Sequence, residues 1–259
     1  MSGIAGYDRL FRLDGRRAVV VGAGSGIGRE SALALAAHGA EVICADRDLQ
    51  SAQQTAKDAR GASAYQLDLL DAAAVQAAAV ALDRVDVLVF TPATNVRKRL
   101  LDQSPEEIDA VLDLNLRAVF TLLRAFGPGM ADRGRGSVIG LSSIRALTVE
   151  PGQGVYAATK AGVVQLLRVF AAELGPYGVR ANAIAPGVVE TPLTAQIRDH
   201  PQWYEAYARK SALGRWAQPS EIAGAVVYLA GDAASFVTGA CLVVDGGWTV
   251  IDGRFDPPA

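Results

Sequence analysis

Short apolar runs alternate with longer alanine-rich helical patterns along almost the whole chain. In order, the runs read RRAVVVGA, EVICAD, SAYQLDL, VDVLVF, GSVIGLSS, VRANAIAP and CLVVDGG. The first is continuously apolar at its centre, as a strand covered on both faces should be. Alternation of this kind predicts parallel strands joined by crossing helices. We therefore expect an α/β fold, a single-domain doubly wound parallel sheet with helices on both faces.

Local signals mark where the predicted helices begin and end. A helix covers about residues 27–38, and Gly39 is a natural stop. Ser104 is placed to cap a helix that begins at Pro105, and Glu107 completes a capping box. A long helix passes through DLNLRAVFTLLRAF, and another covers about 154–174. No linker, repeat or charge block divides the chain, so residues 1–259 are read as one domain.

Composition narrows the class of protein. With 51% hydrophobic residues in 259, the chain has ample material for a buried core. The net charge of −2 provides no basic field for nucleic acid or anionic membrane. The N-terminus lacks a signal-peptide pattern, and no apolar run reaches the length of a membrane helix, so we expect a cytoplasmic protein. Cys44 and Cys241 lie in predicted strands as buried thiols, and no metal-ligand cluster is present.

A glycine-rich stretch, VVVGAGSGIGRE, joins the first strand to the first helix. Glycines permit a tight turn and close backbone approach, and the helix N-terminus then offers free N–H groups to a pyrophosphate. Such a cluster can also be only a tight turn, but this one lies where a Rossmann-type dinucleotide fold needs it. The cofactor contacts expected here are Gly22, Ser25, Gly26, Ile27 and Gly28.

The end of the second strand predicts the choice of cofactor. Asp46 lies 18 residues beyond Gly28, where a carboxylate accepts hydrogen bonds from ribose hydroxyls and repels a 2′-phosphate. This favours NAD over NADP. Arg47 could instead pair with a 2′-phosphate, or be a solvated surface charge. Asp68, with Leu69, could meet the adenine, or Asp68 could simply cap a turn.

Tyr156 and Lys160 are four residues apart and share one face of a predicted helix. A phenol, with a pKa near 10, is a poor acid or base at neutral pH, but a nearby positive charge lowers that pKa. The tyrosine could then serve as a general acid or base. The same spacing also fits a tyrosine packed into a core with a lysine at its edge.

Taken together, these motifs resemble the short-chain dehydrogenase/reductase family over about residues 16–248. Its serine lies 13 residues before the tyrosine, which gives Ser143, and its asparagine matches Asn115 in LDLNL. The residues that carry the resemblance are Gly22, Gly26, Gly28, Asn115, Ser143, Tyr156, Lys160, Pro186, Gly187 and Thr191.

The resemblance implies a role for each catalytic candidate. Tyr156 exchanges a proton with the substrate oxygen, and Ser143 donates a hydrogen bond to that oxygen. Lys160 lowers the tyrosine pKa and bonds the nicotinamide ribose, while Asn115 bends its helix and holds a proton-relay water. Further cofactor contacts are implied at Thr91, Pro92, Pro186, Gly187, Val189 and Thr191.

The sequence departs from the family beside the cofactor. Phe90, Thr91, Pro92 and Ala93 replace the usual Asn-Asn-Ala-Gly, and Val21 replaces a threonine that helps tie the first strand to that segment. Because both ends of one polar link look changed, our hypothesis is that apolar packing of Val21 and Phe90 replaces it.

Residues 191–216 occupy the family's variable substrate lid. Trp203, Tyr204 and Tyr207 could stack on a substrate, although two of the three are expected to pack the lid onto its own body. A polar rim including Glu150 suits a polyol, sugar or sugar acid. The candidate substrate residues are Arg97, which could equally be solvated, Arg145, Gln153 and Trp203.

Three functions compete. The first is an NAD-dependent oxidoreductase that interconverts a secondary alcohol and a ketone on such a small polar molecule. The second is an NADP-dependent 3-oxoacyl-thioester reductase, for which the basic VRKR run is the only hint. The third is a non-catalytic cofactor-sensing or scaffold protein, and the presence of all four catalytic candidates counts against it.

The resemblance also implies a homotetramer or a homodimer. One subunit interface of the family uses two long helices, which would be residues 106–126 and 156–174 here. Another uses the last helix and the last strand, which would be residues 220–230 and 241–247. The tail, about 249–259, contains Val250, Ile251 and Phe255 next to Trp248. Disordered tails are poor in large apolar groups, so we expect this one to be ordered across a subunit boundary, or else folded back on its own subunit.

Overall fold

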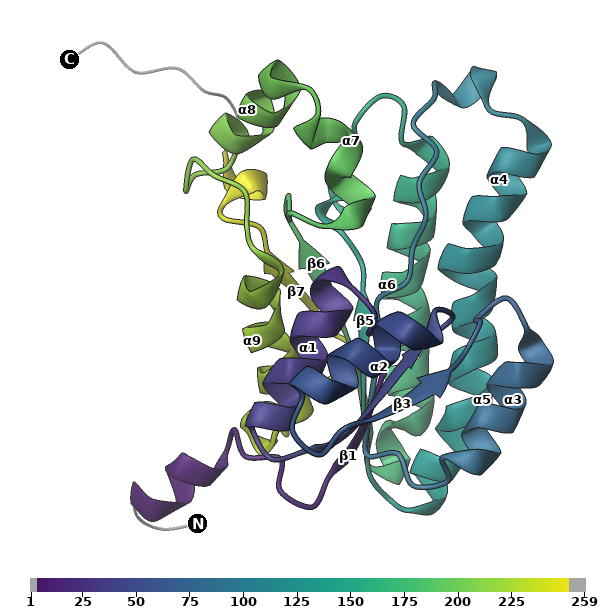
Figure 1. Cartoon of the computed structure of the whole chain (residues 1–259), viewed down its shortest axis with the longest axis vertical. Coiled ribbons are helices and arrows are strands. Elements are labelled where there is room, and N and C mark those ends of the chain that lie inside the picture. The colour runs from purple at the N-terminus through teal and green to yellow at the C-terminus, as the bar shows by residue number, and fades with distance from the viewer. Residues whose placement is uncertain (1–3, 252–259) are drawn as a thin grey trace.

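The computed structural model describes residues 4–251, and a seven-stranded parallel sheet forms its centre (Figure 1). The strand order is β3-β2-β1-β4-β5-β6-β7, so the predicted doubly wound sheet is confirmed. The strands are β1 (Arg17–Val21), β2 (Glu41–Asp46), β3 (Ser63–Gln66), β4 (Val87–Phe90), β5 (Gly136–Leu141), β6 (Val179–Pro186) and β7 (Cys241–Val244). The order reverses between β1 and β4, and α/β folds bind ligands at the carboxyl ends of the strands at such a point.

Helices cover both faces of the sheet, and each face has its own apolar core (Figure 1). One face carries α1 (Gly26–Ala37), α2 (Leu49–Asp58) and α9 (Pro219–Ala230). The other carries α3 (Ala72–Ala81), α5 (Ala118–Asp132) and α6 (Gly154–Leu174), with α4 (Pro105–Leu112) against α6. The short helices α7 (Ala195–Arg198) and α8 (Pro201–Lys210) rise above the sheet within the predicted lid.

The predicted helix boundaries follow local hydrogen bonds. Ser104 and Glu107 form the expected capping box at the start of α4. Asp48 and Asp71 each accept two backbone N–H groups in the first turn of the following helix. Gly39 adopts a φ of 98°, a conformation that favours glycine and ends α1.

The long helix predicted through DLNL is interrupted by a π-helical turn at Asp113–Arg117, which joins α4 to α5. Asn115, at the centre of this turn, is buried. Its Oδ1 accepts the Thr94 backbone N–H at 2.8 Å, and its Nδ2 donates to the Thr94 carbonyl at 2.9 Å. A π-turn adds a residue to the helix and redirects side chains. The expected distortion at Asn115 is therefore confirmed, and it fixes the loop after β4.

Helix α6 corrects one expectation from the sequence. The segment Gly154–Tyr177 is long enough to cross a membrane, and its mean hydropathy of 1.2 is sufficient, although no such run was expected. Val163, Leu167 and Ala171 on this helix are buried in the core on the sheet. A helix that covers the centre of a sheet is apolar for that reason. Cys44 is buried as expected, whereas Cys241, on the edge strand β7, is only half-buried.

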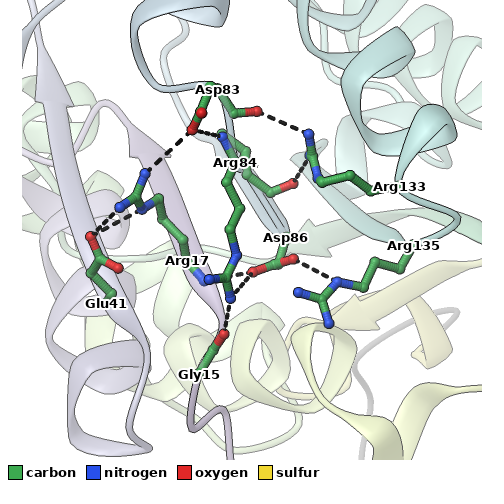
Figure 2. Close-up of polar contacts among 9 residues, drawn as sticks. Gly15, Arg17, Glu41, Asp83, Arg84, Asp86, Arg133 and Arg135 are labelled. Atoms are coloured by element: carbon green, nitrogen blue, oxygen red, sulfur yellow. Dashed lines mark hydrogen bonds and ion pairs between the residues drawn. The ribbon is translucent and has the colours of Figure 1, made fainter.

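The amino ends of the central strands are joined by a buried carboxylate (Figure 2). Asp86 is only 4% exposed and accepts the Arg17 backbone N–H at 2.9 Å. It forms ion pairs with Arg84 at 3.3 Å and Arg135 at 2.9 Å. Arg133 donates to the carbonyl of Asp83 in the same loop at 2.9 Å. This group connects the starts of β1, β4 and β5, at the opposite end of the sheet from the predicted site.

Candidate active site

A cavity of about 620 Å³ opens at the carboxyl ends of the strands, where the strand order reverses. Three of the four catalytic candidates, Ser143, Tyr156 and Lys160, line it, while Asn115 lies behind it. The predicted cofactor residues that line it are Gly22, Ser25, Gly26, Ile27, Asp46, Arg47, Asp68, Leu69, Thr91, Pro92, Pro186, Gly187, Val189 and Thr191. The structure thus gathers in one cavity residues that are far apart in the sequence.

The glycine loop shapes one wall. Gly22 has a φ of 85°, and a Cβ there would lie 2.4 Å from the Thr91 hydroxyl. A Cβ at Gly28 would lie 2.0 Å from the Gly22 carbonyl oxygen, so only glycine lets α1 pack this closely on the loop. Gly28 does not line the cavity, and its expected cofactor contact is corrected to a packing role. The start of α1 beside this loop lines the cavity through Ser25, Gly26 and Ile27, and helix N-termini of this kind bind phosphate groups in other proteins.

Asp46 is oriented by the backbone around it. Its Oδ2 accepts the Gly24 N–H at 2.9 Å, and its Oδ1 accepts the Asp48 N–H at 3.0 Å. Each oxygen can accept a further hydrogen bond, and Asp46 lines the cavity, which suits ribose hydroxyls. Arg47 lines the same cavity with an exposed side chain. Asp68 also lines the cavity, and its Oδ1 accepts the Leu70 N–H at 2.9 Å, which confirms that it caps a turn; its contact with the adenine stays a prediction.

The contact between β1 and β4 was predicted only in part. Val21 and Phe90 are register neighbours and are buried in the same core, as the hypothesis required. A polar link is nevertheless present, because the Thr91 hydroxyl donates to the Val21 carbonyl at 3.2 Å and the Thr91 N–H donates to it at 3.1 Å. Apolar packing therefore accompanies the link and does not replace it. The hydroxyl comes from the β4 side.

Lys160 lies beside Tyr156 but turns its charge toward the sheet. Its Nζ is 5.6 Å from the centre of the Tyr156 ring and donates to the Leu141 carbonyl at 2.8 Å. Only 3% of the lysine is exposed, and this loss of solvent lowers its pKa to about 8.

The pKa of Tyr156 is raised, not lowered as the sequence led us to expect. Loss of solvent around the phenol is the largest effect, and it outweighs a hydrogen bond with Ser143 and the charges of Arg97 and Arg145, each of which lowers the pKa. Lys160 does not counter this loss of solvent, because its own pKa of about 8 lies below that of the phenol, so the lysine is neutral at the pH at which the phenol ionises.

Neighbouring hydroxyls hold this pair in place. Ser143 follows β5, and its Oγ accepts the Arg145 N–H at 3.1 Å, so it caps the short 3₁₀ helix Ile144–Ala146 and also hydrogen-bonds Tyr156. Ser142 donates to the carbonyl of Lys160 at 2.8 Å, which ties α6 to β5. Thr159 receives a hydrogen bond from Asn115 at 3.2 Å.

The lid packs through its aromatic residues, as predicted for two of the three. Tyr204 stacks on Trp216 with ring centres 4.8 Å apart, and Tyr207 lies between Trp216 and Trp248. Trp203 is half-buried, with the Arg97 guanidinium 5.3 Å from its ring centre.

None of the four predicted substrate residues lines the cavity, and two of them, Arg145 and Gln153, are more buried than a rim would be. Glu150 explains this, because it pairs with Arg145 at 2.5 Å and accepts hydrogen bonds from Gln153 and Tyr207. Arg145 and Gln153 are consequently drawn beneath the lid, with exposed fractions of 8% and 3%. Asn95 belongs to the same network, since it donates to Gln153 at 3.0 Å.

Comparison with known proteins identifies the family. A family model described as enoyl-(acyl carrier protein) reductase matches residues 22–249, most of the chain. The chain is a short-chain dehydrogenase/reductase. It is an oxidoreductase that acts on alcohol groups.

Several relatives of this short-chain dehydrogenase/reductase resemble it over nearly their whole length. Galactitol 2-dehydrogenase (L-tagatose-forming) of Cereibacter sphaeroides is 41% identical, covering 94% of this chain and 99% of the relative. D-threitol dehydrogenase of Mycolicibacterium smegmatis is 41% identical over 93% of this chain and 95% of its own. The crystal structure of gluconate 5-dehydrogenase from Burkholderia cenocepacia, in complex with NADP and tartrate, has a TM-score of 0.90 at 34% identity, covering 93% of this chain and 98% of that one.

The site of this short-chain dehydrogenase/reductase also contains residues that sequence reasoning missed. Gly24, Thr94 and Leu141 line the cavity, and Ser142, which lines it too, joins α6 to β5. Ser142 and Leu141 adjoin the predicted Ser143, so a wider reading of the end of β5 would have found them. Asn95 lies in a loop without a motif, and only the fold brings it to Gln153.

Proposed function

We propose that this short-chain dehydrogenase/reductase uses NAD to interconvert a secondary alcohol and a ketone on a polyol, sugar or sugar acid. The observation that carries the proposal is one cavity with Ser143, Tyr156 and Lys160 at one end and the Asp46 carboxylate at the other. A nicotinamide dinucleotide fits between them, and when bound it supplies the hydride acceptor or donor.

In the proposed reaction, Tyr156 acts as the phenol on reduction and donates its proton to the carbonyl oxygen. On oxidation it first loses that proton, and the phenolate then takes the proton of the substrate hydroxyl. Ser143, already hydrogen-bonded to Tyr156, donates to the same oxygen and fixes its position. Lys160 stands within 5.6 Å of the ring, and its lowered pKa of about 8 lets it give up or accept a proton near neutral pH. Asn115 keeps the Thr94 segment and Thr159 in register behind the pair.

The preference for NAD rests on Asp46. Its carboxylate is held toward the cavity by two backbone N–H groups and forms no ion pair within residues 4–251. A 2′-phosphate placed there would meet an uncompensated negative charge. Arg47 is the opposing consideration, and a solved relative named gluconate 5-dehydrogenase is in complex with NADP. We assign the greater weight to Asp46, since its orientation is fixed whereas Arg47 is exposed.

The names of the relatives support a small hydroxylated substrate, since they include a galactitol, a D-threitol and a gluconate dehydrogenase. A 3-oxoacyl-[acyl-carrier-protein] reductase from Thermotoga maritima is 34% identical and represents the alternative. That alternative needs a free basic surface for a carrier protein. In the VRKR run, however, Lys98 is paired with Glu107, and the Arg97 guanidinium lies over Trp203. Arg99 is then the remaining cation of the run that could contact a carrier protein.

We further propose a cytoplasmic homotetramer or homodimer of one-domain subunits, with residues 191–216 as the substrate lid. Exposed Phe120 on α5 and Val169 on α6 are large apolar groups of the kind that an interface would cover. The proposed tail covers about residues 249–259. Next to it, Trp248 is buried against Tyr207 of its own subunit, while Val250 within it is 79% exposed. Residues 252–259 lie outside the described residues.

The proposal is tested by following absorbance of the reduced nucleotide with a panel of alditols, sugars and aldonates, each with NAD and with NADP. Tyr156→Phe should lower kcat by about 100-fold or more, because it removes the proton-exchanging group. Its dissociation constant for NAD should stay within about twofold, since little volume is lost. Retention of most activity in the phenylalanine variant would contradict the proposed role.

A further inference from the structure

The loop that follows β4 contains two buried polar atoms that no described residue satisfies. The Nε of Arg97 and the Oδ1 of Asn95 are sealed from solvent, and within residues 4–251 neither has a hydrogen-bond partner. Native structures rarely leave such atoms unpaired, because each one destabilises the fold. One of these atoms is a cationic donor, and the other is a neutral acceptor.

Both residues lie next to the proposed reaction centre. Thr94, immediately before them, lines the cavity. The amide of Asn95 donates to Gln153, three residues before Tyr156. The charge of Arg97 reaches Tyr156 and lowers its pKa. A substrate oxygen placed at Tyr156 would therefore bring the rest of the substrate toward these two side chains.

Arg97 is held in position but is not neutralised. Its guanidinium carbon lies 5.3 Å from the centre of the Trp203 ring, a contact that restrains the side chain, and its Nε has no hydrogen-bond partner among the described residues. Among the described residues, its cationic neighbours are paired, Lys98 with Glu107 and Arg145 with Glu150, but Arg97 forms no ion pair.

The charges under the lid do not balance. Arg97 and Arg145 contribute two positive charges, and Glu150 contributes one negative charge that Arg145 already holds at 2.5 Å. The Glu150 carboxylate also accepts hydrogen bonds from Gln153 and Tyr207, so it has little capacity for another cation. Among the described residues, the Arg97 guanidinium is therefore left without a counter-charge just outside the lining of the cavity, close enough to Tyr156 for its charge to act on the phenol.

We propose that Arg97 binds a carboxylate of the substrate and that Asn95 Oδ1 accepts a hydrogen bond from a substrate hydroxyl. The edge of a guanidinium matches a carboxylate in a bidentate pair, which a neutral polyol cannot form. The substrate is then a hydroxylated acid of the aldonate class. This inference rests on the proposed oxidoreductase function and selects one substrate class within it.

The test compares each aldonate with the alditol of the same configuration, such as D-gluconate with D-glucitol and D-galactonate with galactitol. In the wild type, kcat/KM should be at least about tenfold higher for the acid of the preferred pair. Arg97→Gln should raise KM for that acid by about tenfold or more, with a smaller change in kcat. The acid-to-alditol ratio should fall toward one. Arg99→Gln, which removes an exposed cation two residues away, should keep the wild-type ratio.

Binding separates this inference from the proposed function. Calorimetric titration of the aldonates into the enzyme with NADH should show binding that Arg97→Gln weakens by about tenfold or more. Oxidation of alditols without binding or turnover of any aldonate would overturn the inference and leave the proposed function intact. Equal losses on acid and alditol in Arg97→Gln would overturn it as well. Absence of all turnover, with binding that depends on Arg97, would instead refute the function and support the site.

Discussion

Replacing Lys160 with methionine should stabilise the ligand-free enzyme at neutral pH while it removes activity. The lysine is buried, and its pKa falls from 10.5 to about 8 in the folded protein. Below about pH 8 both folded and unfolded chains bind the proton, so the burial penalty is fully present. Between about pH 8 and about pH 10.5 the folded protein loses the proton first, and the penalty disappears.

The structure sets the size of this effect. The difference between the two pKa values is equivalent to about 3 kcal/mol of destabilisation at pH 7. Methionine has a similar length and no charge. It cannot form the hydrogen bond from Nζ to the Leu141 carbonyl, however, and this loss cancels about 1 kcal/mol of the gain in stability. Lys160→Met should therefore increase the free energy of unfolding by about 2 kcal/mol near pH 7. That gain should shrink by about 2 kcal/mol near pH 9.5.

Urea unfolding at equal protein concentration, followed by circular dichroism at both pH values, measures the difference. Lys57→Met removes an exposed lysine on α2 and serves as the control, whose difference from wild type should not vary with pH. The reasoning is refuted if Lys160→Met is no more stable than wild type near pH 7. An unchanged gain near pH 9.5 would refute it equally.

Three further changes test other parts of the structure. Asp46→Ala should narrow or reverse the preference for NAD over NADP in kcat/KM, because it removes the acceptor for the ribose hydroxyls and the repulsion of a 2′-phosphate. If the wild-type enzyme already favours NADP, Arg47 and not Asp46 determines the choice of cofactor. Thr91→Val should reduce stability by about 1 kcal/mol in urea unfolding, through loss of its hydrogen bond to the Val21 carbonyl. Asp86→Ala should reduce stability by about 2 kcal/mol, because the Arg17 N–H is left unpaired while the largely exposed arginines regain water. The kcat/KM of Asp86→Ala should equal that of the wild type, because Asp86 lies at the opposite end of the sheet from the proposed active site. A lower kcat/KM would contradict this.

The parts of this protein that sequence predicted are those with local or evenly spaced signals. Alternating runs predicted the sheet, and Ser104 and Glu107 lie close enough along the chain to predict a helix start. The spacing of Ser143, Tyr156 and Lys160 predicted one wall of the cavity, because each lies at a strand end or on one helix face.

Contacts between distant segments were beyond the reach of such signals. Asp86 meets Arg17 and Arg135 only after β1, β4 and β5 are aligned, and nothing around Asp86 in the sequence marks it. The pKa of Tyr156 depends on how deeply the phenol is buried and on where the Lys160 ammonium points. Spacing within a helix fixes neither of these.

The group around Asp86 has a consequence for engineering (Figure 2). It ties the strands together at the end at which no predicted substrate or cofactor residue lies, so this anchor does not depend on the loops at the opposite end. Segments after β4 and β6 can then be exchanged with those of a relative to transplant specificity, because the graft leaves the anchoring arginines untouched. Libraries that randomise the exposed residues within 191–216 should accordingly yield folded variants more often than libraries that randomise residues 83–86.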